Sequence, residues 1–357
     1  MKTKVIFGLL GLLGLLVFLA HAWVVGSAVW GDGRFYYQYL PSIVIDKNLG
    51  PPNKYAIGPA IFWLPFFTLA HLIIRGDGYS FVYQLFTGLG SVFYGLLGLF
   101  LCFLTAKRFF SEKVALLATM GIWLGSNLFF YTVLDPINSH VISFFVASLI
   151  VYLWTKDKLG RLGELGLLVG ILGMVRSQDL IFALPLLVWA RKPKKILLLA
   201  GGILLGFLPQ LAIWKIQSGQ LTSPYLLAGE KFNWLKPQIL AVLFGQNNGL
   251  FYYSPILVFG LLGILGRLQK YFWAKVGIAL FLMQIYLISC WHNWWGGQAY
   301  GGRMFIGLMP FFILGLAGML ERLKKIKMLT PLLTSLMMVI LIINNFCMMA
   351  KFLITSP

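Results

Sequence analysis

Charged residues are scarce in this chain, and acidic ones are the scarcest. Only 11% of the 357 residues are charged, with 10 acidic against 29 basic side chains, whereas 59% are hydrophobic and the mean hydropathy is +0.85. A soluble domain of this length could not bury so much apolar surface, so lipid must be the solvent for most of the chain. The composition therefore indicates a membrane protein.

Cysteines and histidines are few as well. The cysteines Cys102, Cys290 and Cys347 lie inside or at the edges of apolar runs, and the four histidines are scattered along the chain. This spacing excludes a disulfide framework and a clustered metal motif. The net charge of +19 is divided among short basic clusters, and no nucleic-acid recognition motif accompanies them. We expect no nucleic-acid partner.

What the chain does have is a series of uncharged runs long enough to cross a bilayer, which takes roughly 17–25 residues. They cover 5–30, 81–106, 114–134, 136–155, 196–214, 276–302, 304–320 and 328–350, with an interrupted run at 238–266 whose spanning part is expected at 252–266. The first run resembles a secretory signal, but the later ones favour an uncleaved helix. We predict an all-α polytopic membrane protein, one transmembrane domain over 1–357 with about eleven spans and no separate soluble domain.

The basic clusters predict how these spans are oriented. Clusters of Lys and Arg in short loops are typical of the cytoplasmic side, and here they occupy 107–113, 156–161, 191–195, 267–270 and 322–327. With a cytoplasmic N-terminus, residues 26–80 form the first outer loop and the C-terminus lies outside. Span parity then makes 55–74 a juxtamembrane or re-entrant helix.

Parity also makes 165–190 a hairpin, because both of its ends carry cytoplasmic signals. Its tip is the tetrapeptide Arg176-Ser177-Gln178-Asp179. Each arm has about a dozen residues, or ~18 Å of helix, which is short of the ~30 Å hydrocarbon core. The tip is therefore expected below the outer surface, where an ionisable side chain is costly and indicates function.

Several stretches of the expected outer face together resemble one enzyme family, the GT-C glycosyltransferases. They are GDGRFYYQYLPSIVID (31–46), KYAIGPAIFWLPFFTLAHL (54–72), SHVISFF (139–145), GILGMVRSQD (170–179), SPYLLAGEKFNW (223–234) and WHNWWGGQAYGGRMFIGLMP (291–310). The chain is most similar to bacterial relatives of the protein O-mannosyltransferases and the lipid A aminoarabinose transferases. It departs from them in lacking a paired Asp-Glu in the first loop and a large soluble C-terminal domain.

The resemblance implies a GT-C fold in the bacterial inner membrane with an extracytoplasmic active site. The implied reaction moves a sugar from an undecaprenyl-phosphate-type carrier to an outside acceptor, which can be a lipid, a glycan or a protein, with inversion at the sugar carbon. The alternative is a transporter or flippase of lipid-linked saccharides. Such transporters usually carry internal repeats, and none is visible here. A noncatalytic scaffold is a third reading, which poorly explains an embedded arginine.

Asp32 occupies the position of the catalytic acidic residue in this family. A carboxylate within hydrogen-bond reach can take the proton of an attacking hydroxyl, and flanking glycines let the backbone approach a ligand closely. The alternative role for Asp32 is an N-cap on the helix that starts near Arg34. Asp46 is expected either to contact the acceptor or to be an ordinary turn residue.

The phosphate of the donor requires fixed positive charge nearby. Arg176 is the first candidate, Arg303 the second, and Lys54 and His140 are weaker ones. Arg176 could instead form a buried pair with Asp179, one helical turn away. Arg303 could be an interfacial arginine that reaches the headgroups, and His140 a plain structural histidine.

Sugar and acceptor contacts are expected from polar and aromatic side chains of the outer loops. The candidates are Tyr36, Gln246, Asn247, His292 and Trp295. An interfacial aromatic belt explains the tryptophan equally well, and the two amides could cap a broken helix. No cofactor is expected, although a divalent ion held by Asp32 with His140 or Asp135 stays open.

Overall fold

The computed structural model describes residues 2–156, 161–324 and 331–355. The regular structure in this part of the chain is helical apart from one isolated bridge between Phe232 and Trp291. Its longer helices are α1 (Lys2–Val25), α4 (Gly58–Ile74), α5 (Phe81–Ala106), α6 (Glu112–Gly125), α8 (Ser139–Lys156), α9 (Leu162–Val175), α11 (Pro193–Ser218), α15 (Ile256–Leu265), α16 (Phe272–Cys290), α17 (Met309–Leu323) and α18 (Pro331–Thr355). The all-α prediction is confirmed for the described residues.

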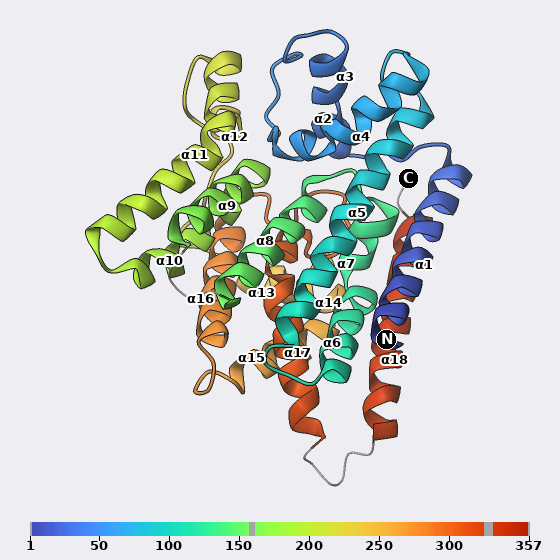
Figure 1. Ribbon diagram of the computed structural model, residues 1–357, viewed down its shortest axis with the longest axis vertical. Helices are drawn as coiled ribbons and strands as arrows, with labels where there is room; N and C mark the ends of the chain where they lie inside the picture. Colours follow the sequence, from blue (N-terminus) through green and yellow to red (C-terminus); the bar gives the residue numbers. More distant parts are fainter. Residues whose placement is uncertain (1, 157–160, 325–330, 356–357) are drawn as a thin grey trace.

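Short helices fill the connections between them. They are α2 (Gly33–Tyr37), α3 (Tyr39–Val44), α7 (Asn127–Phe129), η1 (Phe130–Leu134), η2 (Ser177–Phe182), α10 (Ala183–Ala190), α12 (Pro224–Leu227), α13 (Ile239–Phe244), α14 (Leu250–Tyr253) and η3 (Arg303–Leu308). In Figure 1, α2, α3 and α12 lie at the upper end, whereas the α5–α6 and α15–α16 turns lie at the lower end.

Seven helices of the described chain are long and apolar enough to cross a membrane, so the protein is a multi-pass membrane protein. These segments are Val5–Val25, Phe81–Ala106, Ser139–Lys156, Pro193–Ser218, Phe272–Cys290, Arg303–Leu323 and Leu332–Thr355. A bent pair of helices makes an eighth if it is counted as one span. The predicted count of eleven is not confirmed, because four further apolar helices are shorter than a span: Gly58–Ile74, Leu162–Val175, Ser177–Ala190 and Ile256–Leu265.

Two predicted runs are not continuous helices. The run 114–134 bends by 76° at Ser126, whose side chain accepts a hydrogen bond from the Leu128 amide and so starts a new helix. The run 276–302 is helical only to Cys290. Beyond it, Gly296, Gly297 and Gly301 adopt positive φ, a region that breaks a helix. Both breaks lie within uncharged apolar runs, so the hydrophobicity of the sequence did not predict them.

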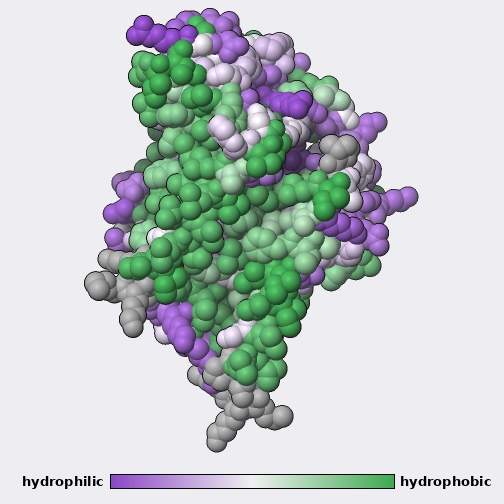
Figure 2. Space-filling view, turned by 90° about the vertical axis from the view of Figure 1, so that its right-hand side faces the viewer, coloured by the Kyte–Doolittle hydropathy of each residue, from purple (hydrophilic) through white to green (hydrophobic). Residues whose placement is uncertain are grey.

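The helices form a buried centre and a lipid-facing rim. Within their most apolar windows, 89% of the η3–α17 segment is buried, against 17% of α1 and of α18 and 28% of α11. Helices α5, α8 and α16 are intermediate, with 56% to 72% buried. Figure 2 shows a broad apolar surface over the middle of the molecule and hydrophilic residues gathered at its upper end. Apolar side chains that cannot be buried inside are thus placed where lipid covers them.

The first loop is folded against the bundle and is not an open linker. Gly33 begins α2, and a Cβ there would lie 2.2 Å from the Ile137 carbonyl oxygen, so only glycine permits this approach. Gly31 has a φ of +40°. The two glycines therefore seat Asp32 against the segment that leads into α8.

The segment 165–190 breaks where the sequence predicted it to break. Helix α9 ends at Val175, Arg176 has extended backbone torsions, and η2 and α10 lead back along α9. Because Arg176 leaves the helix, its side chain can turn toward the start of α8. The hairpin carries the arginine to the end of the bundle that also holds α2.

Candidate functional site

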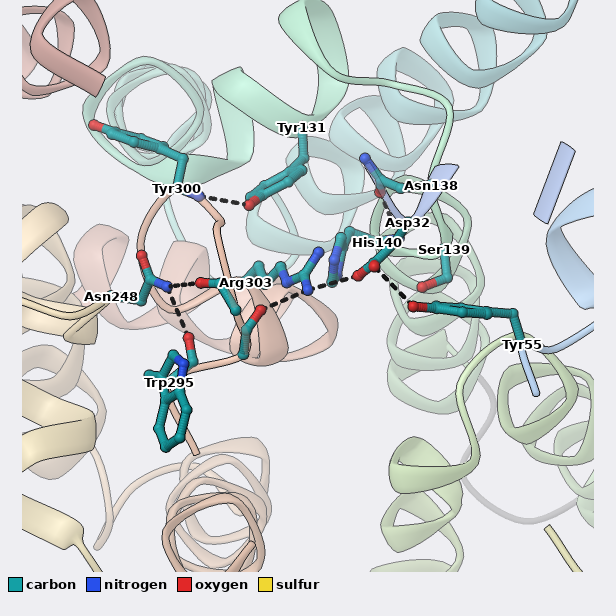
Figure 3. Close-up of polar contacts among 12 residues, drawn as sticks. Asp32, Tyr55, Tyr131, Asn138, Ser139, His140, Asn248, Trp295, Tyr300 and Arg303 are labelled. Atoms are coloured by element: carbon teal, nitrogen blue, oxygen red, sulfur yellow. Dashed lines mark hydrogen bonds and ion pairs between the residues drawn. The ribbon is translucent and has the colours of Figure 1, made fainter. Parts of the chain in front are cut away.

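Asp32 lies at the centre of a polar cluster that joins three distant parts of the chain. Its Oδ2 is 2.7 Å from Arg303 Nη2, and its Oδ1 accepts a hydrogen bond of 2.8 Å from the Tyr55 hydroxyl. Figure 3 shows the carboxylate between these two side chains. Asp32 does occupy the N-cap position of α2, but its side chain makes no capping bond. The carboxylate therefore bonds within the cluster and does not cap the helix.

The charge of Asp32 is stabilised by its neighbours. Burial by itself raises the pKa of this carboxyl, but the Arg303 charge, the hydrogen bonds from Tyr55 and Arg303, and the Arg176 charge together hold the pKa below its ordinary value. The side chain remains 34% exposed, so a ligand can reach it. Asp32 is consequently ionised and accessible at neutral pH.

Tyr55 was not among the predicted site residues, and its position is well determined. Its amide donates to Asn53 Oδ1 at 2.9 Å and its carbonyl accepts from the Tyr39 hydroxyl at 3.1 Å. Its ring stacks on Phe35 with a centroid distance of 4.8 Å. A tyrosine in a proline-rich loop has no sequence signal that would mark it as the partner of a particular carboxylate.

Arg176 forms a second part of the cluster, at the first turn of α8. Its Nη1 lies 2.8 Å from Ser139 Oγ and 3.1 Å from His140 Nδ1, and its Nη2 donates to Gln178 Oε1 at 3.1 Å. The predicted alternative, a pair with Asp179, exists only loosely, since Nε and Oδ2 are 4.0 Å apart. Asp179 instead accepts a bond of 2.6 Å from Ser143. The guanidinium is therefore held mainly by neutral groups.

Arg176 and Arg303 are tied together through the backbone of η3. Gln178 binds the Arg176 guanidinium with its Oε1 and donates from Nε2 to the Met304 carbonyl at 2.8 Å. Gln284 donates to the same carbonyl at 3.1 Å. Arg303 Nη2, which bonds Asp32, also donates to the Gly296 carbonyl at 2.7 Å. One frame thus orients both arginines.

Tyr36 is close enough to the two arginines and the carboxylate to feel all three charges. It is buried, which raises the pKa of its hydroxyl, while the Arg176 charge and a hydrogen bond with Ser139 oppose that shift. The structure therefore brings together five predicted residues: Asp32, Tyr36, His140, Arg176 and Arg303.

Lys54 and Asp46 lie outside this cluster. Lys54 places its ammonium 5.1 Å from the Tyr225 ring centre and 5.8 Å from that of Tyr55, so within the described chain Tyr55 links it to the cluster. Asp46 is exposed in the turn after α3, and its amide bonds the Pro41 carbonyl at 3.1 Å. No contact to the cluster is made by Asp46 among the described residues, which favours its reading as a turn residue.

The remaining predicted residues divide into two groups. Gln246, Asn247 and Trp295 line one open hollow of about 190 Å³. His292 lies elsewhere, with Nδ1 3.3 Å from Glu230 Oε2. Glu230 also accepts a bond of 2.7 Å from the Trp291 indole. His292 therefore fastens the loop before α13 to the loop after α16 and does not reach the cluster.

Asp135 is a further carboxyl near the cluster. The residue is partly buried, but its Oδ1 is inaccessible and has no hydrogen-bond partner in the described chain. Burial raises the pKa of Asp135 to about 7, against the lowering influence of the Arg303 charge and a hydrogen bond with Asn138. A buried acid with a raised pKa destabilises the fold once it is ionised.

Replacing Asp135 by Asn should change how stability depends on pH. Between about 4, the usual pKa of an aspartate, and about 7 the folded protein binds more protons here than the unfolded chain. The free energy of unfolding therefore falls by up to roughly 1.4 kcal/mol per pH unit in that window. Asp135→Asn should remove this fall, so its Tm should exceed that of the wild type above pH 7 and converge with it near pH 4. Thermal unfolding in detergent measures this, with the exposed Asp77→Asn as control. Parallel curves for wild type and Asp135→Asn would contradict it.

Asp32, His140 and Asp135 do not form a metal site in the structure. The described residues contain no group of three or more His, Cys, Asp or Glu side chains placed to hold an ion. The charge complementary to Asp32 is instead supplied by Arg303 and Arg176.

The site thus combines an accessible carboxylate with two oriented guanidinium groups at one end of a multi-pass helical bundle. The chain matches no protein-family model, and comparison with curated proteins finds no similar one.

Proposed function

We propose that this chain is a GT-C-type glycosyltransferase that moves a sugar from a polyprenyl-phosphate carrier of the undecaprenyl type to an extracytoplasmic acceptor. One observation carries the proposal. A carboxylate that can serve as a base, Asp32, bonds Arg303 at 2.7 Å, and a guanidinium that can bind an anion, Arg176, is held through Gln178 to the carbonyl of the next residue, Met304. This is the pair of groups that phosphate displacement by a hydroxyl needs.

In the proposed reaction the acceptor hydroxyl attacks C1 of the sugar. A bond from the acceptor oxygen to C1 forms while the bond from C1 to the phosphate oxygen breaks, and the hydroxyl proton passes to Asp32. The polyprenyl phosphate leaves with the electron pair of the broken bond. A phosphate needs no protonation to leave, so one carboxylate suffices, in contrast to the two carboxyl groups of glycoside hydrolysis.

The phosphate is proposed to bind at Arg176 and the first turn of α8. Arg176 reaches Ser139 and His140 there, and a helix N-terminus favours anions because its dipole is positive. An arginine can hold two phosphate oxygens at once. Charge that builds up on the leaving phosphate would meet groups already in position.

Arg303 is proposed to position Asp32. Its Nη2 holds both the carboxylate and the Gly296 carbonyl, so it fixes the direction in which Asp32 presents its free lone pairs. Binding of the donor phosphate by Arg303 itself, as the sequence led us to expect, stays a prediction. In either case the two guanidinium groups are mostly shielded from water, since the Arg303 side chain is 19% exposed and that of Arg176 14%.

The carrier chemistry agrees with the surroundings of the site. Seven apolar helices make a bilayer the solvent of the bundle, and a polyprenyl chain is confined to that solvent. A donor with such a tail reaches the site from the membrane, while a polar acceptor approaches from water. The location in a bacterial inner membrane with the site outside belongs to this proposal.

A turnover assay tests the proposed function. Purified protein in nanodiscs is incubated with a panel of polyprenyl phosphates that carry different radiolabelled sugars, with crude envelope glycans and lipids as acceptors. We expect label to leave one carrier and appear in an acceptor. Saturable binding of a carrier without any loss of label would overturn the transferase and favour a transporter of lipid-linked saccharides.

A further inference from the structure

The hollow at the loop between α16 and η3 has the composition of a sugar site. Its volume is about 190 Å³, larger than the ~150 Å³ that admits a benzene-sized molecule in an engineered protein cavity. Four amide residues and three aromatic residues line it: Gln246, Asn247, Asn248, Gln298, Tyr253, Trp295 and Phe352. A sugar ring has the same two kinds of surface, hydroxyl groups at its rim and C–H groups on its faces.

Three of the four amides of this hollow are free to bind a ligand. Within the described ranges of the chain, the side chains of Gln246, Asn247 and Gln298 make no hydrogen bond, and all three residues are exposed. Each amide offers two donors and one acceptor with two lone pairs, which suits hydroxyl groups that both give and accept. The Trp295 ring beside them is 40% exposed.

The two loops around the hollow are held in place by hydrogen bonds from side chains to backbone carbonyls. Asn248 has a φ of +62° and donates from Nδ2 to the carbonyls of Trp295 at 2.7 Å and Gly297 at 2.9 Å. The Tyr253 hydroxyl donates to the Gln246 carbonyl at 3.0 Å. A non-glycine residue with positive φ is unfavourable and persists where the surroundings enforce it, often at ligand sites. The two loops are thus fixed before any ligand arrives.

The hollow is connected to Asp32 through a single guanidinium. The carbonyl of Gly296, between Trp295 and Gly297, accepts a hydrogen bond from Arg303 Nη2. The same nitrogen bonds Asp32. Figure 3 shows Asn248 and Trp295 on one side of Arg303 and Asp32 with Tyr55 on the other. Arg176 and His140, which are proposed to bind the phosphate, lie on the Asp32 side.

We propose that this hollow binds a neutral saccharide and that the bound sugar is the acceptor. The assignment of the bound sugar as the acceptor rests on the proposed transferase function. Saccharide binding itself does not, because it can occur without transfer. In this arrangement the acceptor comes from the hollow side of Arg303 and the carrier phosphate binds at Arg176 on the other side, so the two can meet opposite faces of the sugar C1, as displacement with inversion requires. The acceptor is then a glycan or a glycolipid and not a protein side chain.

Saccharide binding is measured on the full chain in nanodiscs with no carrier present. Saturation-transfer NMR with the methyl glycosides of glucose, galactose, mannose and N-acetylglucosamine identifies a binding sugar, and titration gives its affinity. We expect at least one of them to bind and Trp295→Ala to weaken that binding by about tenfold. Asn247→Ala, an exposed change with no packing loss, should weaken it as well. Trp234→Ala, which removes another half-exposed tryptophan away from the hollow, should leave it unchanged.

The two proposals fail in different ways. If none of the four glycosides binds, or if both Trp295→Ala and Asn247→Ala bind like the wild type, the saccharide site is overturned. If a glycoside binds in the hollow but no carrier is turned over, the hollow stands and the transferase fails. If carriers are turned over while no glycoside binds, the transferase stands and its acceptor binds elsewhere.

Discussion

Asp32→Asn should lower the rate of sugar transfer by about 10²–10⁴-fold while carrier binding survives. The amide keeps the shape of the carboxylate. Its one oxygen can still accept from Arg303, which bonds Asp32 at 2.7 Å, and its NH2 group can donate to the Tyr55 hydroxyl, which lies 2.8 Å from the carboxylate. It cannot take up a proton from a hydroxyl. Loss of label from the carrier gives the rate, and competition by unlabelled carrier gives the affinity.

The matched control for this experiment is Asp77→Asn. Asp77 is an exposed carboxylate in the turn after α4, where its Oδ1 accepts a bond of 2.9 Å from the Tyr79 amide. We expect its transfer rate to equal that of the wild type. An Asp32→Asn protein that transfers at the wild-type rate would remove Asp32 from the base role, and Asp46→Asn would be the next variant to measure.

The pH profile of the wild type provides a second check on Asp32. A general base must be ionised, so activity falls as the pH drops through its pKa. The charges of Arg303 and Arg176 hold the pKa of Asp32 below that of an ordinary aspartate, against the effect of burial. The acid limb of kcat/KM should therefore lie below pH ~4. An acid limb above that pH would indicate a different base.

Arg176→Ala should weaken carrier binding and transfer together, by about 10²–10³-fold in kcat/KM. The side chain is 14% exposed and lies at the first turn of α8. Within the described chain its guanidinium is held chiefly by neutral partners. A phosphate would replace these neutral partners with a charge-assisted, two-oxygen contact. Competition by unlabelled carrier measures the affinity change, and transfer of label measures the rate.

Arg176→Lys separates charge from geometry. Lysine keeps the positive charge but not the planar fork, so binding should recover in part and transfer less. Arg34→Ala is the control, because Arg34 is an exposed arginine of α2 on the same end of the molecule. Equal carrier affinity in wild type, Arg176→Ala and Arg176→Lys would exclude Arg176 from the phosphate site.

Helices could be predicted where hydrophobicity alone determines them. An uncharged run of about twenty residues has one stable conformation in lipid, since an unpaired backbone amide there is costly. The predicted run 81–106 has the bounds of α5, and 304–320 lies within η3 and α17. The errors came where polar backbone contacts interrupt an apolar run, as at Ser126 and after Cys290.

Candidate residues could be predicted where their chemistry conflicts with their surroundings. Arg176 in an apolar hairpin and Asp32 between two glycines are such conflicts, and both belong to the cluster. Tyr55 and Gln178 could not be found this way, because a tyrosine in a polar loop and a glutamine beside an arginine fit their local sequence. Their role depends on partners more than twenty or a hundred residues away.

The amino-acid sequence by itself determines that lipid surrounds this protein and that its polar residues lie at the ends of the apolar runs. Long apolar runs exclude water, and local composition is enough for that. The pairing of Asp32 with Arg303, 271 residues apart, and the use of His292 to fasten a loop to Glu230 were decided only by the packing of the helices. Ion pairs are selected by distance in three dimensions, and a linear pattern of charges contains many pairings that the fold does not use.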